Sequence, residues 1–302
     1  MTRDKFAITA LDTRMSLIDL ILNLAGLLLW ISWRAVPFDP LVKRRPATLP
    51  GTIRPAEPSH VRPWRFLLVL ALVLLLRPAL YRLIGPSLDW TPAIKLGAIS
   101  VSFRSDDFWR MAIFSCASFM HVLMLFYLWL LLFSFLTARG PDADVCSQFV
   151  RIQLGRVHHW GVCRKISLPF LAALVIWLLA GSLLGAMQLV PPAQSWVHRL
   201  EQGIVLGLGT YLVWKYAIGA LLGLHLLNTY VYLGAHPFWK FIPTLGQRLL
   251  APLRGLPLLI GRVDFAPVLM IVLVFVAAEF IENGFGPHHK FGLTWLFSRL
   301  PL

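Results

Sequence analysis

Charged side chains are scarce in this chain of 302 residues. They make up 14% of it, against about 25% in an average soluble domain, whereas 58% of the residues are hydrophobic. A soluble fold needs more polar surface than this, and a disordered chain contains far less Leu, Val, Phe and Trp. The composition therefore predicts an all-α, polytopic helical membrane protein, because helices satisfy their own backbone hydrogen bonds inside a bilayer.

Acidic residues and cysteines are also few. There are 14 Asp and Glu against 28 Lys and Arg, a net charge of +14, and only three cysteines. Three cysteines do not build a disulfide framework. The chain also lacks Gly-x-Ser-x-Gly, P-loop and His-Glu-x-x-His motifs. We therefore predict that it is not an enzyme, with no catalytic residues and no cofactor.

Six apolar runs are candidates for membrane spans. They cover 17–33, 66–84, 109–136, 167–190, 203–233 and 265–281. Five of them approach or exceed the length that crosses about 30 Å of hydrocarbon at about 1.5 Å per residue. Arg77-Pro78 interrupts the run 66–84, so two arrangements remain open. The chain forms about six spans, or five spans plus a re-entrant segment.

The basic residues gather between these runs. Sixteen of the 28 lie in the three loops 34–65, 137–166 and 233–264, which share one side of the membrane if all six runs span. The positive-inside rule places that side in the cytoplasm and favours six spans. Cations beside apolar runs indicate anionic lipid headgroups as partners, and not nucleic acid. We expect an integral protein of a bacterial cytoplasmic membrane.

The sequence contains an internal duplication. Pro37-Phe38, Leu75-Leu76-Arg77-Pro78 and Asp89-Trp90-Thr91-Pro92 correspond to Pro237-Phe238, Leu249-Leu250-Ala251-Pro252 and Asp264-Phe265-Ala266-Pro267. We therefore divide a single membrane domain, 1–302, into four parts. These are a first repeat 15–136 with a basic, Pro-rich insertion 40–64, a connecting loop and extra span 137–201, a second repeat 202–283, and a tail 284–302.

The second repeat resembles the YggT family of integral membrane proteins. The elements 249–254 and 261–267 are similar to two family motifs, and Lys215 is similar to a family lysine in the preceding span. The matching residues are Pro252, Arg254, Gly261, Asp264, Phe265, Pro267 and Lys215, with first-repeat equivalents Pro78, Asp89, Trp90 and Pro92. Arg248, Gly255 and Arg262 depart from the motifs. The resemblance implies a non-enzymatic protein that supports the assembly or organisation of membrane complexes.

Lys215 is the most costly residue in the predicted spans, because an intramembrane lysine needs a partner or a wet cavity. Glu279, Glu282 and Asp19 are candidate partners. A structural ion pair or a snorkelling lysine is the simpler interpretation. The alternative is a small ion or solute transporter or channel that uses Lys215 and Glu279.

Other motifs predict structure. The segment 239–263 mixes aromatic and basic residues as an amphipathic element at the headgroup layer does, and Asp264 is expected to cap the next span with Pro267 in its first turn. Three Gly-x-x-x-Gly pairs predict close helix packing, within the chain, between copies of the chain or with other membrane proteins. They are Gly181 and Gly185, Gly203 and Gly207, and Gly219 and Gly223.

Histidines and cysteines suggest no metal or haem site. His121 and His225 differ in depth by roughly 10 Å under six spans at about 1.5 Å per residue, too much for a shared haem. Cys146, His158, His159 and Cys163 lack the Cys-x2-Cys spacing of structural zinc sites. We interpret His121 and His225 as polar packing residues, and the two cysteines as cytosolic thiols beside a basic loop.

Overall fold

The computed structural model describes most of the chain as helix. The described residues are 2–35, 62–85, 90–96, 99–103, 105, 107–137, 145–186, 195–231, 234, 237–253, 255, 259–260, 263–285 and 290–299. The α-helices are α1 (Thr2–Ala35), α3 (Trp64–Ile84), α4 (Phe108–Thr137), α5 (Val145–Leu154), α6 (Val162–Ala186), α7 (Trp196–Gly209), α8 (Trp214–Tyr230), α9 (Pro237–Leu249), α10 (Ala266–Asn283) and α11 (Leu293–Arg299).

Short elements join these helices. Three 3-10 turns are η3 (Gly155–His159), η4 (Thr210–Val213) and η5 (Ala251–Leu253). The strands are β1 (Ala93–Leu96), β2 (Ile99–Ser102), β3 (Leu259–Ile260), β4 (Val263–Asp264), β5 (Gly284–Phe285) and β6 (Lys290–Phe291), which pair as β1–β2, β3–β4 and β5–β6. The expected all-α class is confirmed.

Six helical segments are long and apolar enough to cross a membrane, as the sequence predicts. They are Met15–Ala35, Trp64–Ile84, Phe108–Thr137, Val162–Ser182, Trp196–Tyr230 and Ala266–Asn283. The fifth segment is not one uniform helix. Its α-helical hydrogen bonding changes to a 3-10 turn at Thr210–Val213, where the Thr210 hydroxyl donates to the Gly207 carbonyl over 2.7 Å.

Helix α3 continues through the Arg77-Pro78 step that could have ended it. Pro78 lies inside the helix and is buried, and 21 residues form one segment. A proline removes one helical hydrogen bond and usually kinks or breaks a helix. Here the helix ends only at Gly85, whose amide donates to the Tyr81 carbonyl over 2.7 Å. The segment 66–84 is therefore long enough to span, and Pro78 supplies no break for re-entry.

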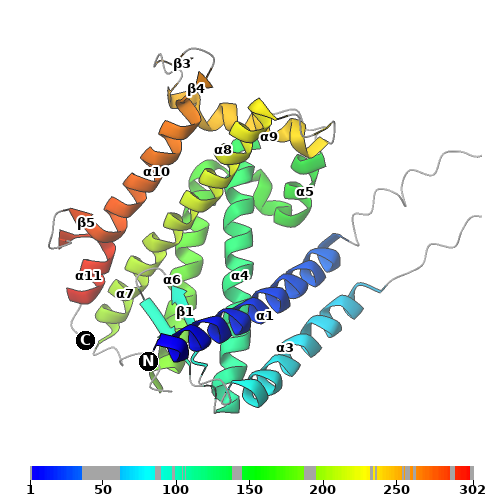
Figure 1. Ribbon diagram of the computed structural model, residues 1–302, viewed down its shortest axis with the longest axis vertical. Helices are drawn as coiled ribbons and strands as arrows, with labels where there is room; N and C mark the ends of the chain where they lie inside the picture. The colour runs from blue at the N-terminus through cyan, green and yellow to red at the C-terminus, as the bar shows by residue number, and fades with distance from the viewer. Residues whose placement is uncertain are drawn as a thin grey trace, which may run out of the picture. The chain divides into compact units, whose positions relative to one another are not determined.

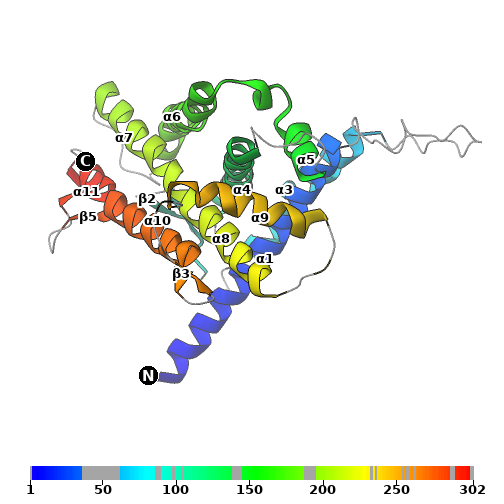
Figure 2. The same cartoon turned by 90° about the horizontal axis from the view of Figure 1, so that it is seen from above.

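The chain divides into two compact units. Unit 1 comprises Met1–Pro92 and Ser102–Met124, and unit 2 comprises Ala93–Val101 and Leu125–Leu302. In unit 1, α1 and α3 lie side by side and run in opposite directions (Figures 1 and 2). Gly26 of α1 permits a close approach to α4, because a Cβ there would lie 2.9 Å from the Phe119 ring.

Unit 2 is built around α8, which contacts both α9 and α10. Helix α9 crosses the end of α8 (Figure 1) and buries Phe241, Ile242 and Leu245 against Leu222. Helix α6 packs along α7 (Figure 2). The predicted amphipathic segment 239–263 thus begins with a helix whose apolar side faces protein. Its placement at the headgroup layer remains a prediction.

Two of the three basic loops meet at one end of unit 2. Lys165, at the start of α6, donates to Ser134 of α4 over 2.8 Å. Arg248 of α9 donates to the Leu136 carbonyl, which lies in the last turn of α4, where carbonyl groups lack helical donors. The described parts of the loops 137–166 and 233–264 therefore lie at the same end of unit 2, as both the six-span arrangement and the alternative with a re-entrant segment require.

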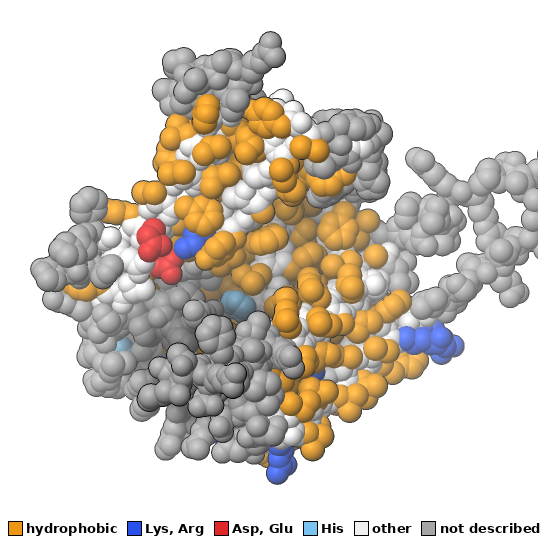
Figure 3. Space-filling model, viewed as in Figure 1, with side chains coloured by type: hydrophobic (Ala, Val, Ile, Leu, Met, Phe, Trp, Pro, Cys, Tyr) orange, Lys and Arg blue, Asp and Glu red, His pale blue; other side chains and the backbone are white. Residues whose placement is uncertain are grey.

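The helix surfaces are strongly apolar. On the face drawn in Figure 3, apolar side chains cover much of the described surface, and charged side chains are few. Leu68, Leu72, Leu75 and Leu83 of α3 are all exposed. Such a surface suits lipid or a partner helix and not water.

Candidate functional site

A buried ion pair joins the first two spans of unit 1. Arg77 of α3 donates through Nη2 to Oδ1 of Asp19 on α1, and the two side chains are only 1% and 18% exposed. The other two nitrogens of the Arg77 guanidinium also have hydrogen-bond acceptors. Nε donates to the Tyr81 hydroxyl and Nη1 to Oδ1 of Asn23, each over 3.0 Å.

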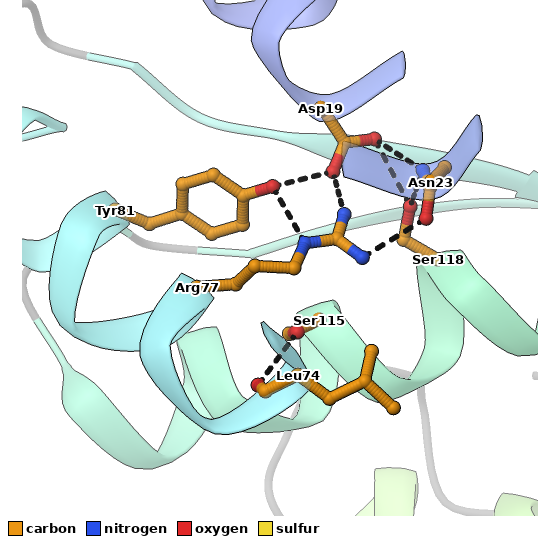
Figure 4. A network of polar contacts seen from close by, with 7 residues as sticks. All are labelled: Asp19, Asn23, Leu74, Arg77, Tyr81, Ser115 and Ser118. Atoms are coloured by element: carbon orange, nitrogen blue, oxygen red, sulfur yellow. Dashed lines mark hydrogen bonds and ion pairs between the residues drawn. The ribbon is translucent and has the colours of Figure 1, made fainter. Parts of the chain in front are cut away.

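The Asp19 carboxylate accepts further hydrogen bonds from three helices (Figure 4). The Tyr81 hydroxyl donates to Oδ1 over 2.7 Å. Ser118 of α4 donates to Oδ2 over 3.0 Å, and the Asn23 amide donates to both Oδ2 (3.0 Å) and the Ser118 hydroxyl (2.9 Å). We call Asp19, Asn23, Arg77, Tyr81 and Ser118 the Asp19–Arg77 network.

Two aromatic rings pack against Tyr81, a member of this network. The Tyr81 ring lies 5.2 Å from Trp90 and 5.9 Å from Phe114, and Trp90 meets Phe114 edge to face at 5.8 Å. Tyr81, Trp90 and Phe114 are all buried. Water exclusion strengthens the attraction between the buried charges, and the matched partners offset the cost of removing them from water. The arrangement binds α1, α3 and α4 together.

The sequence predicted Asp19 as a polar residue of the first span but missed Arg77. Arg77 was interpreted with Pro78 as an interruption of an apolar run. A usable signal was present, because opposite charges in two successive apolar runs each need a partner. Of the first-repeat equivalents, Pro78, Trp90 and Pro92 are buried, and the Pro92 carbonyl accepts from the Phe103 amide. Asp89 lies outside the described residues.

A second ion pair lies in unit 2. Lys215 of α8 donates to Oε2 of Glu282 on α10 over 2.8 Å, with side chains 10% and 30% exposed. The Tyr216 ring centroid lies 5.3 Å from the lysine Nζ. Glu279 accepts instead from Asn283, one turn along the same helix. Of the three predicted partners of Lys215, the structure selects Glu282, and Asp19 pairs elsewhere.

The motif residues of the second repeat have structural roles where they are described. Oδ1 of Asp264 accepts from the Ala266 amide over 2.9 Å at the start of α10, and Pro267 lies buried in the first turn. The Asp264 amide donates to the Tyr230 hydroxyl over 3.2 Å. Phe265 and Pro252 are exposed. Arg254 and Gly261 lie outside the described residues.

The six glycines of the Gly-x-x-x-Gly pairs differ in their surroundings. A Cβ on Gly203 would lie 2.6 Å from Leu174, one on Gly207 would lie 2.8 Å from Phe170, and one on Gly219 would lie 2.9 Å from Phe275. These glycines therefore permit close contacts of α7 with α6 and of α8 with α10. Gly181 meets only Trp177 of its own helix, Gly223 meets nothing within 4 Å, and Gly185 is half-buried.

The histidines and cysteines form no metal site among the residues that the structure describes, since no three of His, Cys, Asp and Glu are placed to hold an ion. His121 belongs to unit 1 and His225 to unit 2. The His158 ring lies 3.2 Å from Ser134 and contacts His159. Cys163 is exposed and unpaired.

The candidate sites of the described chain are thus two ion pairs, each closed within its own unit. Each pair joins two neighbouring helices of its unit. Comparisons with protein-family models, with curated proteins and with solved structures find no match to this chain.

Proposed function

We propose that this integral membrane protein is a non-enzymatic scaffold that supports the assembly of membrane complexes, as its resemblance to the YggT family implies. In this proposal, apolar helix faces bind partner membrane proteins, and basic loops at one end anchor the chain to anionic lipid.

The observation that carries the proposal is the closure of the Asp19–Arg77 network. The guanidinium of Arg77 is directed to Asp19, Asn23 and Tyr81 and is almost inaccessible. A transport pathway keeps its charged groups open to an ion or to water. A side chain that is 1% exposed and hydrogen-bonded through all three guanidinium nitrogens favours a role in helix packing.

Helix α10 offers the best-defined surface for a partner. Only 11% of the residues in its most apolar 18-residue stretch are buried within the chain. The corresponding values for the other five candidate spans are 17–39%. Val268, Val272, Val276 and Phe280 are exposed and repeat every four residues, so they form one ridge along the helix. A ridge of valines fits between the side chains of a second apolar helix.

In-cell photocrosslinking tests this surface. With a photoreactive phenylalanine analogue at Val272, we expect a discrete adduct with another membrane protein. The matched control carries the analogue at Leu72, an equally exposed position on α3, and should give lipid adducts. If position 272 also yields only lipid adducts, α10 is not a docking face.

Transport is the second candidate, and the Lys215–Glu282 pair is the observation that favours it. This pair is more exposed than Asp19–Arg77, and a second carboxylate, Glu279, lies one turn away. Proteoliposomes provide the test. Under the transport hypothesis the wild-type chain carries an ion or proton flux that Lys215→Met abolishes. The scaffold proposal expects no flux in either protein.

A further inference from the structure

The segment from α5 to the start of α6 has an unbalanced charge. No Asp or Glu occurs between residues 145 and 200, whereas Arg151, Arg156, Arg164 and Lys165 lie within 145–166. This segment belongs entirely to unit 2 and lies at the end where α4 stops and α6 begins. The nearest acidic residues along the chain are Asp142 and Asp144, directly before α5 and outside the described residues, and Glu201 of α7.

The cations around the start of α6 differ in their surroundings, and Arg151 of α5 is half-buried and has a partner. Lys165 is buried, with its Nζ directed to Ser134 and 6.0 Å from the Phe135 ring centroid. Arg156 and Arg164 have exposed side chains. Within the described part of the chain, neither guanidinium has a hydrogen-bond or ion-pair partner. Two arginines with all their donors free are therefore presented outward.

Exposed apolar side chains lie close to these arginines in the sequence. Trp160, Val162 and Ile166 are 39%, 60% and 45% exposed. The fourth candidate span begins at Val162, so the arginines and Trp160 lie where a span leaves the hydrocarbon. Tryptophan and arginine at that level are typical of side chains that contact lipid carbonyl and phosphate groups.

The backbone changes conformation twice within the short segment that carries these groups. Gly155 adopts φ 55° between α5 and η3, a conformation that suits glycine. The chain then extends at Trp160, and α6 begins after Gly161, whose carbonyl accepts from the Lys165 amide over 3.1 Å. A glycine there supplies no side-chain cap, so the positive end of the α6 dipole adds to the potential of the arginines.

We propose that this turn, residues 155–166, is a binding site for the headgroup of an anionic phospholipid. Arg156 and Arg164 bind the phosphate, and Trp160 lies in the carbonyl layer beneath it. The site rests on the proposed function in one respect, namely that the basic loops face an anionic leaflet. It assigns the headgroup site to this turn, whereas the described part of α9 buries apolar side chains and directs Arg248 to α4.

Cys163 makes the proposal directly measurable, because it is an exposed free thiol between Trp160 and Arg164. Cys116→Ser and Cys146→Ser leave it as the single cysteine for a bimane label. The full chain is reconstituted in nanodiscs of phosphatidylcholine with a minority of phosphatidylglycerol, and one lipid or the other is brominated near its ester groups. We expect brominated phosphatidylglycerol to quench the label more than brominated phosphatidylcholine at equal mole fraction.

Substitutions of Arg156 and Arg164 test whether these arginines cause the preference for phosphatidylglycerol. Each arginine contributes about 1 kcal/mol to anionic lipid binding, equivalent to about five-fold in occupancy. Arg156→Gln with Arg164→Gln should therefore remove the preference, and Arg164→Gln alone should reduce it. The matched control is Arg62→Gln with Arg65→Gln, which removes the same charge from two exposed arginines before and at the start of α3.

Two results would overturn the proposal. One is equal quenching by the two brominated lipids in the wild-type background. The other is an equal loss of preference in the two double variants, because a general charge effect needs no site. Either result leaves the crosslinks at Val272 unaffected, so failure of the lipid site and failure of the scaffold function are distinguishable.

Discussion

Replacing Asp19 by leucine should destabilise unit 1 strongly, because it leaves Arg77 buried without its anion. Removing one partner of a buried pair costs about 3–5 kcal/mol. Tyr81, Asn23 and Ser118 also lose an acceptor, and polar contacts between membrane helices average about 0.6 kcal/mol each. Since both charged side chains are well under one-third exposed, little of this cost is screened by solvent. We expect Asp19→Leu to lower the free energy of unfolding by about 3–5 kcal/mol.

The double variant distinguishes an ion pair from general packing. Asp19→Leu with Arg77→Met removes both charges and keeps similar volumes, so the chain should recover most of the loss. The assay is reversible unfolding in mixed detergent and SDS micelles, followed by proteolytic protection of α3. An unchanged free energy of unfolding in Asp19→Leu, or a double variant as unstable as the sum of the two single variants, would refute the reasoning.

Two further variants test contacts in unit 2. Gly246→Ala should destabilise the α8–α9 contact by about 1–3 kcal/mol, because a Cβ would lie 2.4 Å from the His225 ring. Gly223→Ala, which meets nothing within 4 Å, should leave the thermal midpoint unchanged or raise it, and equal losses in both would contradict the packing. Asp264→Ala should cost about 1 kcal/mol by freeing the Ala266 amide, and hydrogen exchange should then increase at the start of α10. Unaltered exchange there would show that the carboxylate does not cap the helix.

The spans were predictable because length and apolarity alone determine them. A run of about 20 apolar residues has few alternatives to a helix in a bilayer, and the predicted run 66–84 lies within Trp64–Ile84. The hydrogen bond of Asp264 at the start of α10 was also predictable, because it joins residues two positions apart, although the N-cap position itself is Phe265. Both features are local.

The Asp19–Arg77 network was not predicted because its partners are distant in sequence. Asp19 and Arg77 are 58 residues apart, and Ser118 lies 99 residues from Asp19. Composition could show only that each charge needed compensation. Similarly, the amphipathic pattern of α9 does not reveal whether its apolar side meets lipid or protein, and here it meets α8. No residue pattern in the largely apolar run 203–233 predicts the 3-10 turn at Thr210–Val213.

We propose that this chain holds other membrane proteins through the exposed face of α10. The most direct test is the protein mass of the gently solubilised particle, measured by light scattering with the detergent contribution subtracted. We predict a mass above that of one chain for the wild type. Val272→Trp should reduce it to the mass of one chain while leaving thermal stability unchanged. A wild-type particle with the mass of a single chain would contradict the account.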